Sequence, residues 1–260
     1  MDKKLLNPAW VLKKAYLYGR SYCSMGPDDV VLALFPKTGS TWIRFFLYNL
    51  LTITERGNKL VTIDEMNAEM PEFANPNLFR SWTFNSCPRV IKTHRPRNVF
   101  LKGRPTVLVV RDPRDVVVSF YHYANAKKEL SFRGSVKEAL HHPEMGLGYF
   151  FNQYNSWRNQ ADLVLRYEDL RNDGLVTFRK LVDYLKIPAT DEHIELALER
   201  SNLSAMRQAQ EKSVEFKKKF SDGFVFARSG ASEQWKELFD EDDIAYWEQL
   251  RSENQFNLYQ

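Results

Sequence analysis

Residues 30–51 (VVLALFPKTGSTWIRFFLYNLL) constrain the fold of this chain more than any other stretch. The apolar run from Val30 to Phe35 is unbroken, as is typical of a buried strand, and Pro36 ends it. A short loop follows, and the dense apolar residues from Trp42 to Leu51 predict a largely buried helix. The stretch therefore predicts a strand, a tight loop and a helix, the unit from which parallel sheets are built.

The loop between this strand and this helix carries groups that attract anions. Lys37 supplies a cation, Thr38 a hydroxyl and Gly39 flexibility, and Ser40 or Thr41 can cap the helix. The amide groups at the start of a helix also attract phosphate or sulfate. The loop is therefore a predicted anion site, and a purely structural turn is the alternative.

The order of residues in the loop separates it from the loop of ATP- and GTP-binding enzymes. Their loop reads GxxxxGK[ST], with the lysine after the second glycine and a hydroxyl next to it for magnesium. Here Lys37 precedes Gly39, the only glycine of the loop. The segment PKTGSTW instead resembles the 5'-phosphosulfate loop of sulfotransferases that use 3'-phosphoadenosine 5'-phosphosulfate (PAPS).

A second segment, RVIKTHRP, is similar to the KTH segment of the same family. Residues 90–93 predict a strand, and the alternation of side chains along a strand puts Lys92 and His94 on one face. The resemblance implies that Lys92 meets the sulfuryl group, that His94 is the catalytic base, and that Lys37 stabilises the departing oxygen. The alternative for His94 is an ordinary histidine at the end of a strand.

A third segment, TVLVVRDPRDVVVSFYHYA, repeats the plan of strand, turn and helix. Residues 106–110 predict a buried strand, and Asp112 predicts the cap of the following helix. The resemblance implies that Arg111 and Ser119 hold the 3'-phosphate of the nucleotide. The alternatives are an ion pair of Arg111 with a nearby aspartate and a bond from Ser119 back to its own helix.

The second half of the chain resembles the family in its nucleotide contacts. A strand over residues 163–167 leads into YED, whose tyrosine contacts adenine in the family, so Tyr167 is a candidate contact. Glu168 and Asp169 are the alternative, as an acid/base pair, but neighbours on a strand face opposite ways. The resemblance further implies base stacking by Trp42 and adenosine contacts in SNLSAM from Ser201 and Leu203.

The segment RSGASEQWK differs from the RKGxxGDWK that the family uses to close over the 3'-phosphate. A serine replaces the lysine, and the second glycine and the aspartate are missing. The contacts that the resemblance implies here come from Arg228, Ser229 and Gly230.

Residues 64–88 predict a long irregular loop that is rich in aromatic residues, proline and asparagine. Long loops often line substrate sites, although single aromatic side chains pack as readily in a core. The aromatic residues predicted to contact an acceptor are Phe73, Phe79, Trp82, Phe84 and Tyr123.

Composition limits the class of protein. A chain of 260 residues with 43% hydrophobic content can bury the core of one α/β domain over residues 1–260. A net charge of +4 does not indicate a surface that coats nucleic acid, and two cysteines predict neither a disulfide framework nor a metal site. The start of the chain lacks the apolar core of a signal peptide, and no stretch is apolar enough to span a bilayer, so a cytoplasmic location is expected.

Residues 4–20 predict an amphipathic helix with two possible partners. The helix can pack on the domain, which is the expected arrangement, or rest on anionic lipid.

The resemblance implies an α/β domain with a central parallel sheet of the nucleotide-kinase type, flanked by helices. It also implies sulfuryl transfer from PAPS to a hydroxyl or amine of a small aromatic or hydrophobic acceptor, which leaves 3'-phosphoadenosine 5'-phosphate (PAP). A nucleotide-binding protein without turnover and a P-loop nucleotide kinase are the alternatives. The sequence predicts no oligomeric state.

Overall fold

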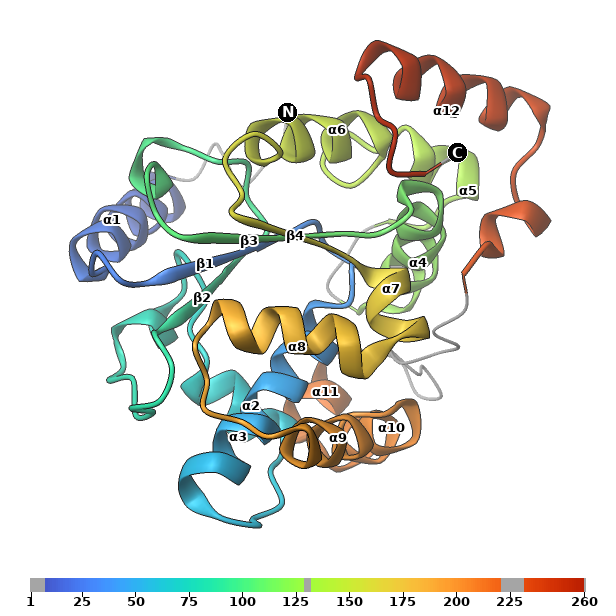
Figure 1. The fold of residues 1–260 in the computed structure, drawn as a ribbon. Coiled ribbons are helices and arrows are strands. Elements are labelled where there is room, and N and C mark those ends of the chain that lie inside the picture. Colours follow the sequence, from blue (N-terminus) through green and yellow to red (C-terminus); the bar gives the residue numbers. More distant parts are fainter. Residues whose placement is uncertain (1–7, 129–131, 221–231, 260) are drawn as a thin grey trace.

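Four parallel strands form the centre of the molecule in a computed structural model that describes residues 8–128, 132–220 and 232–259. The strand order is β2-β1-β3-β4, as Figure 1 shows. The strands are β1 (Val30–Leu34), β2 (Val90–Thr93), β3 (Thr106–Val110) and β4 (Leu163–Arg166). The predicted α/β fold with a central parallel sheet is therefore confirmed.

The central strand β1 owes its place to its apolar run. It pairs with β2 on one side, with Val31 opposite Ile91, and with β3 on the other, with Leu32 opposite Val107. All five of its residues are buried. A strand that is covered on both faces must be apolar at every position, as this one is.

Helices cover both faces of the sheet, and alternate side chains of each strand serve the two layers (Figure 1). On one face, Leu32 and Leu34 pack with helices α2 (Ser40–Arg56), α8 (Gly174–Tyr184) and α9 (Asp191–Arg200). On the other face, Val31 and Ala33 pack with α4 (Pro113–Ala126), α6 (Leu147–Trp157) and α12 (Glu241–Glu253).

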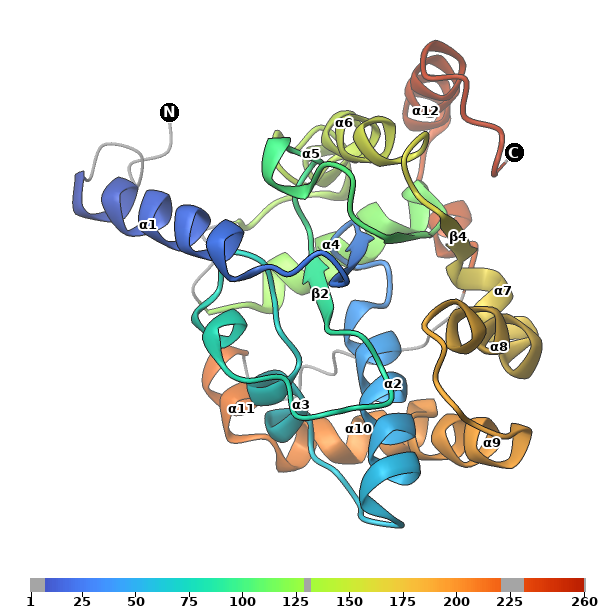
Figure 2. The same cartoon turned by 60° about the vertical axis from the view of Figure 1, so that its left-hand side comes forward.

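Shorter elements connect these layers. Figure 2 shows that the first helix, α1, projects from the rest of the molecule. These elements are α1 (Pro8–Ser24), α3 (Ile63–Glu69), η2 (Pro76–Phe79), η3 (Val99–Leu101), α5 (Val136–Leu140), α7 (Tyr167–Asn172), α10 (Leu203–Lys212), α11 (Val214–Lys219) and η4 (Gln234–Glu237).

Two predictions of local structure are wrong. Residues 64–88 are not wholly irregular, because helix α3 begins in a capping box in which Thr62 and Glu65 bond to each other's backbone amides. Strand β4 ends at Arg166, and Tyr167 begins helix α7. Glu168 and Asp169 are therefore neighbours on a helix, and the argument from strand alternation does not apply to them.

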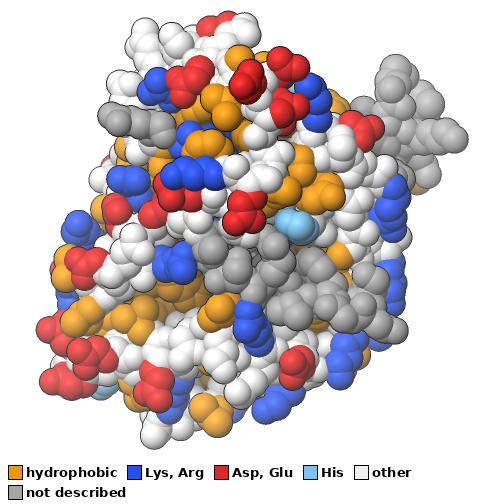
Figure 3. Space-filling view, turned by 90° about the vertical axis from the view of Figure 1, so that its right-hand side faces the viewer, with side chains coloured by type: hydrophobic (Ala, Val, Ile, Leu, Met, Phe, Trp, Pro, Cys, Tyr) orange, Lys and Arg blue, Asp and Glu red, His pale blue; other side chains and the backbone are white. Residues whose placement is uncertain are grey.

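The surface that carries α12 mixes acidic and basic side chains, as Figure 3 shows. Within the described part of the chain, no helix is both long and apolar enough to cross a membrane.

Candidate active site

The carboxyl ends of the four strands bring one predicted site residue each to the same edge of the sheet. Lys37 lies beyond β1, His94 beyond β2 and Arg111 beyond β3, while Tyr167 follows β4 directly. Adjacent strands lie about 4.8 Å apart. The strand order reverses between β1 and β3, and parallel α/β sheets bind ligands in the crevice that opens at such a point.

The turn from β1 into α2 has an unusual backbone. Lys37 and Gly39 both have positive φ angles, of 73° and 86°. Gly39 is the N-cap, and no side chain caps the helix in the described structure. The prediction that Ser40 or Thr41 is the cap is therefore wrong, because both residues lie inside the first turn. The amides of that turn are thus left to other acceptors, such as an anion.

Two features of this loop suit a bound anion. Thr38 is fully buried, and within the described residues its hydroxyl has no hydrogen-bond partner. A buried hydroxyl without a partner is costly, so a ligand oxygen here would stabilise it. At Gly39 a Cβ atom would lie 2.8 Å from the ring of Tyr167, so the loop needs glycine for space as well as for its backbone angle.

Cations converge beside this loop. The Lys37 Nζ atom lies 4.1 Å from the ring centroid of Tyr123, and Arg111 Nη1 donates to the carbonyl oxygen of Lys37 at 3.2 Å. Burial, together with the charges of Arg111 and Lys127, holds the pKa of Lys37 well below its usual range. Like charges held this close favour a polyanionic ligand, which would restore the charged form of Lys37.

His94 is held in one tautomer by the backbone of β1. Its Nδ1 atom lies 2.8 Å from the carbonyl oxygen of Leu34, so Nδ1 carries the hydrogen and Nε2 is left as an acceptor. Burial and the charge of Lys92 lower the pKa of His94 to about 3. The imidazole is therefore neutral at physiological pH, which is the form that can accept a proton.

Glu72 pairs with Lys92 and was not predicted from the sequence. The Lys92 Nζ atom lies 3.1 Å from the carboxylate, and burial lowers the pKa of Lys92 to about 8 while Glu72 raises it. Backbone bonds from Lys92 to Pro71 and from Phe73 to Lys92 hold this segment along the edge of β2. The pairing joins two distant segments, and no local pattern in the sequence indicates it.

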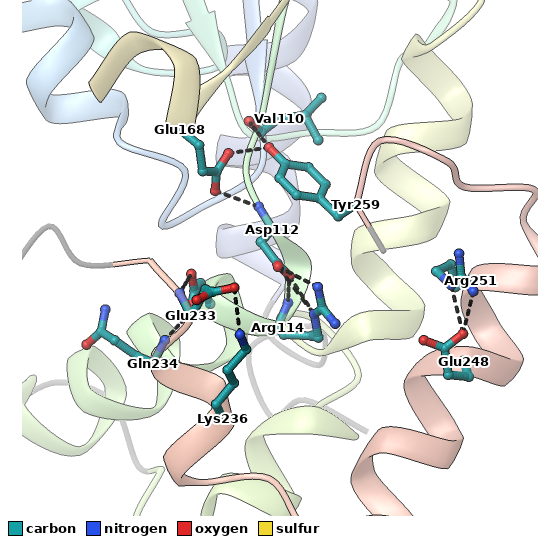
Figure 4. Close-up of polar contacts among 11 residues, drawn as sticks. Val110, Asp112, Arg114, Glu168, Glu233, Gln234, Lys236, Glu248, Arg251 and Tyr259 are labelled. Carbon is teal, nitrogen blue, oxygen red and sulfur yellow. Dashed lines mark hydrogen bonds and ion pairs between the residues drawn. The ribbon is translucent and has the colours of Figure 1, made fainter. Parts of the chain in front are cut away.

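Side chains of the protein cap the turn from β3 into α4 (Figure 4). Asp112 accepts from the amide of Arg114 at 2.9 Å and forms a buried ion pair with its guanidinium at 2.7 Å. Glu168 accepts from the amide of Asp112 at 3.1 Å and from the hydroxyl of Tyr259. Arg114 is thus one partner of a buried ion pair.

Asp115, on the first turn of α4, holds the segment that leads into η4. Its two carboxylate oxygens accept from the amides of Glu233 and Gln234, each at 2.8 Å. Figure 4 labels these two residues. Burial raises the pKa of Asp115. The bonds bring the end of RSGASEQWK to the start of α4, while the predicted contacts Arg228, Ser229 and Gly230 lie outside the described residues.

Residues 27–254 match the family model described as the sulfotransferase domain. The chain belongs to the sulfotransferase family. Among its curated relatives, sulfotransferase 6B1 of Danio rerio is 28% identical over 229 residues, which are 82% of this chain and 74% of that protein. Sulfotransferase 2A6 of Mus musculus is 24% identical over 249 residues, which are 90% and 86% of the two chains.

Solved structures, a sulfotransferase among them, have the same fold. Mouse sulfotransferase SULT7A1 complexed with PAP superposes with a TM-score of 0.71 at 20% identity, over 95% of this chain and 91% of that chain. Retinol dehydratase in a complex with retinol and PAP also has a TM-score of 0.71 at 20% identity, over 96% and 86%.

The other nucleotide contacts expected of a sulfotransferase lie in different environments. Trp42 and Tyr167 meet edge to face, with ring centroids 5.7 Å apart, beside the anion loop. Ser119 is half-buried on α4. Ser201 is fully buried and its hydroxyl donates to the carbonyl of Ala197 at 2.7 Å, whereas Leu203 begins α10 and is exposed.

The aromatic residues predicted for the acceptor site divide into two groups. Tyr123 contacts Lys37, and Phe73 follows Glu72, so both lie near the strand ends. The others pack elsewhere. Phe79 lies under Arg20 of α1, and Trp82 packs on Phe84, which meets Tyr48. Tyr48 is six residues beyond Trp42, which is about 9 Å farther along α2.

Proposed function

We propose that this sulfotransferase transfers the sulfuryl group of PAPS to a hydroxyl or amine of a small acceptor, with His94 as the general base. One observation carries the proposal: Lys37, His94 and Arg111 lie at the ends of adjacent parallel strands, with the carbonyl of Leu34 holding the hydrogen of His94 on Nδ1 and leaving Nε2 as the acceptor. The solved structures that the fold resembles are complexes with PAP.

The residues at the strand ends fit the charges of this donor. PAPS carries roughly four negative charges and supplies an activated sulfuryl group. The amides and hydroxyls of residues 38–42 would hold its 5'-phosphosulfate, with Lys37 beside the bridging oxygen. Arg111 and Ser119 would hold the 3'-phosphate, and Trp42 and Tyr167 would flank the adenine.

Lys92 and His94 divide the chemistry of the transfer between them. Lys92 would stabilise charge on the sulfuryl oxygens, while Nε2 of His94 accepts the proton of the acceptor. The charge of Lys92 lowers the pKa of His94 in the unliganded protein. An anion bound to Lys92 would offset that charge, so it would raise the basicity of His94 when a base is needed.

A small acceptor is proposed, and its chemical class rests on few residues. Of the aromatic residues predicted for the acceptor, Tyr123 and Phe73 lie near the strand ends, and they suit a phenol or an apolar alcohol. Solved relatives are described with retinol or androsterone, which are both small and apolar. The expected cytoplasmic location stays a prediction.

The deciding experiment measures turnover of labelled PAPS with a panel of phenols, alcohols, amines and sugars. Turnover with any acceptor would show that the protein is an enzyme and not a nucleotide-binding protein without turnover. His94→Ala should lower turnover by about 10²- to 10⁴-fold and leave PAP affinity, measured by calorimetry, nearly unchanged. Full activity of this variant would refute the role of His94, and preference for ATP with magnesium over PAP would refute the donor.

A further inference from the structure

Helix α1 is attached to the rest of the molecule by one of its faces. Leu17 and Ser21 are buried on that face, and the Ser21 hydroxyl accepts from the amide of Ala74 at 3.1 Å. The ring of Tyr18 meets Phe73 edge to face at 5.3 Å. The helix therefore packs on the protein, as the sequence predicted, with its opposite face turned away from it (Figure 2).

The opposite face of α1 is apolar and exposed. Large hydrophobic side chains stand out of the surface there, and Leu12 is 70% exposed. Tyr22 also touches Phe100 of the turn η3, where the adjacent Val99 is 78% exposed. At about 100° per residue, the helical members of this face share a sector of about 140°. These residues, which we call the α1 patch, are Val11, Leu12, Tyr16, Tyr22 and Val99.

All the charged residues of helix α1, which carries most of the α1 patch, are positive. Residues Pro8–Ser24 contain Lys13, Lys14 and Arg20 and no acidic residue. Lys13 and Arg20 are exposed and border the patch on one side of the helix, and Lys102, three residues after Val99, is exposed too. Arg20 donates to the hydroxyl of Tyr16 at 2.9 Å, so it stays beside the patch. Helix α12 differs, because acidic residues fill its first turn.

The combination of apolar and cationic side chains favours an anionic lipid surface over a second copy of the chain as the partner of the patch. In a symmetric pair of chains, Lys13 and Lys102 of one copy would meet the same cations of the other, with no acid on the patch to neutralise them. An anionic lipid surface supplies both an apolar layer and negative headgroups, and tyrosine prefers that boundary.

We propose that the α1 patch docks this protein on the surface of an anionic membrane, with α1 lying in the plane of the headgroups. The apolar side chains of Leu12, Tyr16 and Val99 enter the boundary between headgroups and acyl chains, and Lys13, Arg20 and Lys102 bind the phosphates. The attachment is peripheral, and it does not rest on the proposed sulfuryl transfer.

Flotation of the full chain with lipid vesicles tests this proposal. The vesicles contain phosphatidylcholine with about 30% phosphatidylserine, or phosphatidylcholine alone. We expect binding to the anionic vesicles only, and we expect added salt to weaken it because surface charges are screened. No binding to either vesicle, or equal binding to both, would overturn the proposal.

Substitutions locate the binding surface. Leu12→Ser with Tyr16→Ser should lower the partition coefficient about tenfold or more, and Lys13→Glu with Lys102→Glu should do the same. Val176→Ser with Lys180→Glu changes an exposed valine and lysine on α8, and it should leave binding unchanged. Melting temperatures check that each variant folds, and Leu12→Ser alone serves if the double variant does not.

Two further results would overturn the proposal. Vesicle binding that survives both patch variants would overturn the proposal. So would a dimer in sedimentation experiments, lost in Leu12→Ser, together with absent vesicle binding, since the occupant would then be a second copy of the chain.

Discussion

The turns that lead from the sheet into α2 and α4 each join a strand to a helix, but they differ in the groups that bind the first backbone amides of the helix. At the start of α2, Lys37 and Gly39 have positive φ angles and no side chain among the described residues caps the helix. At the start of α4, Asp112 caps the helix and binds Arg114, and Asp115 accepts two more amides. The first turn therefore leaves its amides to a ligand, whereas the second is satisfied within the protein.

This difference teaches that a repeated motif need not repeat its role. The α2 turn offers backbone amides and a cation to an anion. The α4 turn positions the side chain of Arg111, which donates to the carbonyl of Lys37, and Ser119 lies farther along α4. Damage to the α2 turn should thus lower ligand binding and turnover, and damage to the α4 turn should first lower stability.

The largest expected effect is that of Asp112→Ala on stability. Removing one partner of a buried ion pair leaves Arg114 uncompensated, which should cost about 3–5 kcal/mol of unfolding free energy. Urea denaturation measures this cost. Asp112→Asn keeps a cap acceptor and should lose less. A loss of PAP affinity at unchanged stability would contradict the assignment of this turn to structure.

Lys37→Ala should lower turnover by about 10²- to 10³-fold, because the charge beside the departing oxygen is lost. Stability should hardly change, since burial already disfavours the charged lysine. Steady-state kinetics with PAPS measures the effect. Lys180→Ala removes an exposed lysine on α8 and is the matched control, with an expected change below about threefold.

Gly39→Ala should weaken PAP binding by about 10-fold or more, or about 1.4 kcal/mol. The added Cβ strains the positive φ and meets the ring of Tyr167 at 2.8 Å. Gly57→Ala is the control, since Gly57 also has a positive φ at the far end of α2 but nothing lies within 4 Å. Equal losses of affinity in both variants would contradict a local effect at the anion loop.

The smallest expected effect concerns pH. A pKa of about 8 for Lys92 predicts that kcat/KM for PAPS declines as the pH rises through this value, because the neutral amine no longer attracts the sulfuryl group. Glu72 raises this pKa, so Glu72→Gln should move the decline to lower pH. Because the pKa of His94 is about 3, protonation of His94 should not lower kcat/KM between about pH 5 and 7.

Glu69→Gln supplies the comparison for the pH profile. Glu69 pairs with Arg56 near the end of α2, so its loss should leave the profile unchanged. A shift of the same size in both variants would show that the general charge of the protein, and not the pair of Glu72 with Lys92, sets the decline.

The sheet could be predicted because each strand is signalled by its own residues. The run at Val30 is apolar at every position, and the run at Thr106 is apolar after its first residue, as is typical of strands buried on both faces. Helix α3 was missed although TIDE at Thr62 is a capping-box sequence, because the prolines and asparagines that follow it suggested a loop.

The rest of the site depends on contacts between distant segments. Glu72 reaches Lys92 only because Pro71 and Phe73 bond to the edge of β2, and local patterns carry no information on such pairing. Phe84, a predicted acceptor contact, packs on Tyr48, and this contact also joins segments that are distant in the sequence. The residues at strand ends were predictable, since the topology of a parallel sheet collects them.

The bond from His94 to Leu34 has a consequence for protein engineering. The carbonyl that fixes the proton on the imidazole belongs to the last residue of β1, three positions before Lys37. A graft of the proposed base onto another scaffold would need both strands in their native register, because the carbonyl and the imidazole follow different strands. The pair β1 and β2 would thus have to be transplanted together.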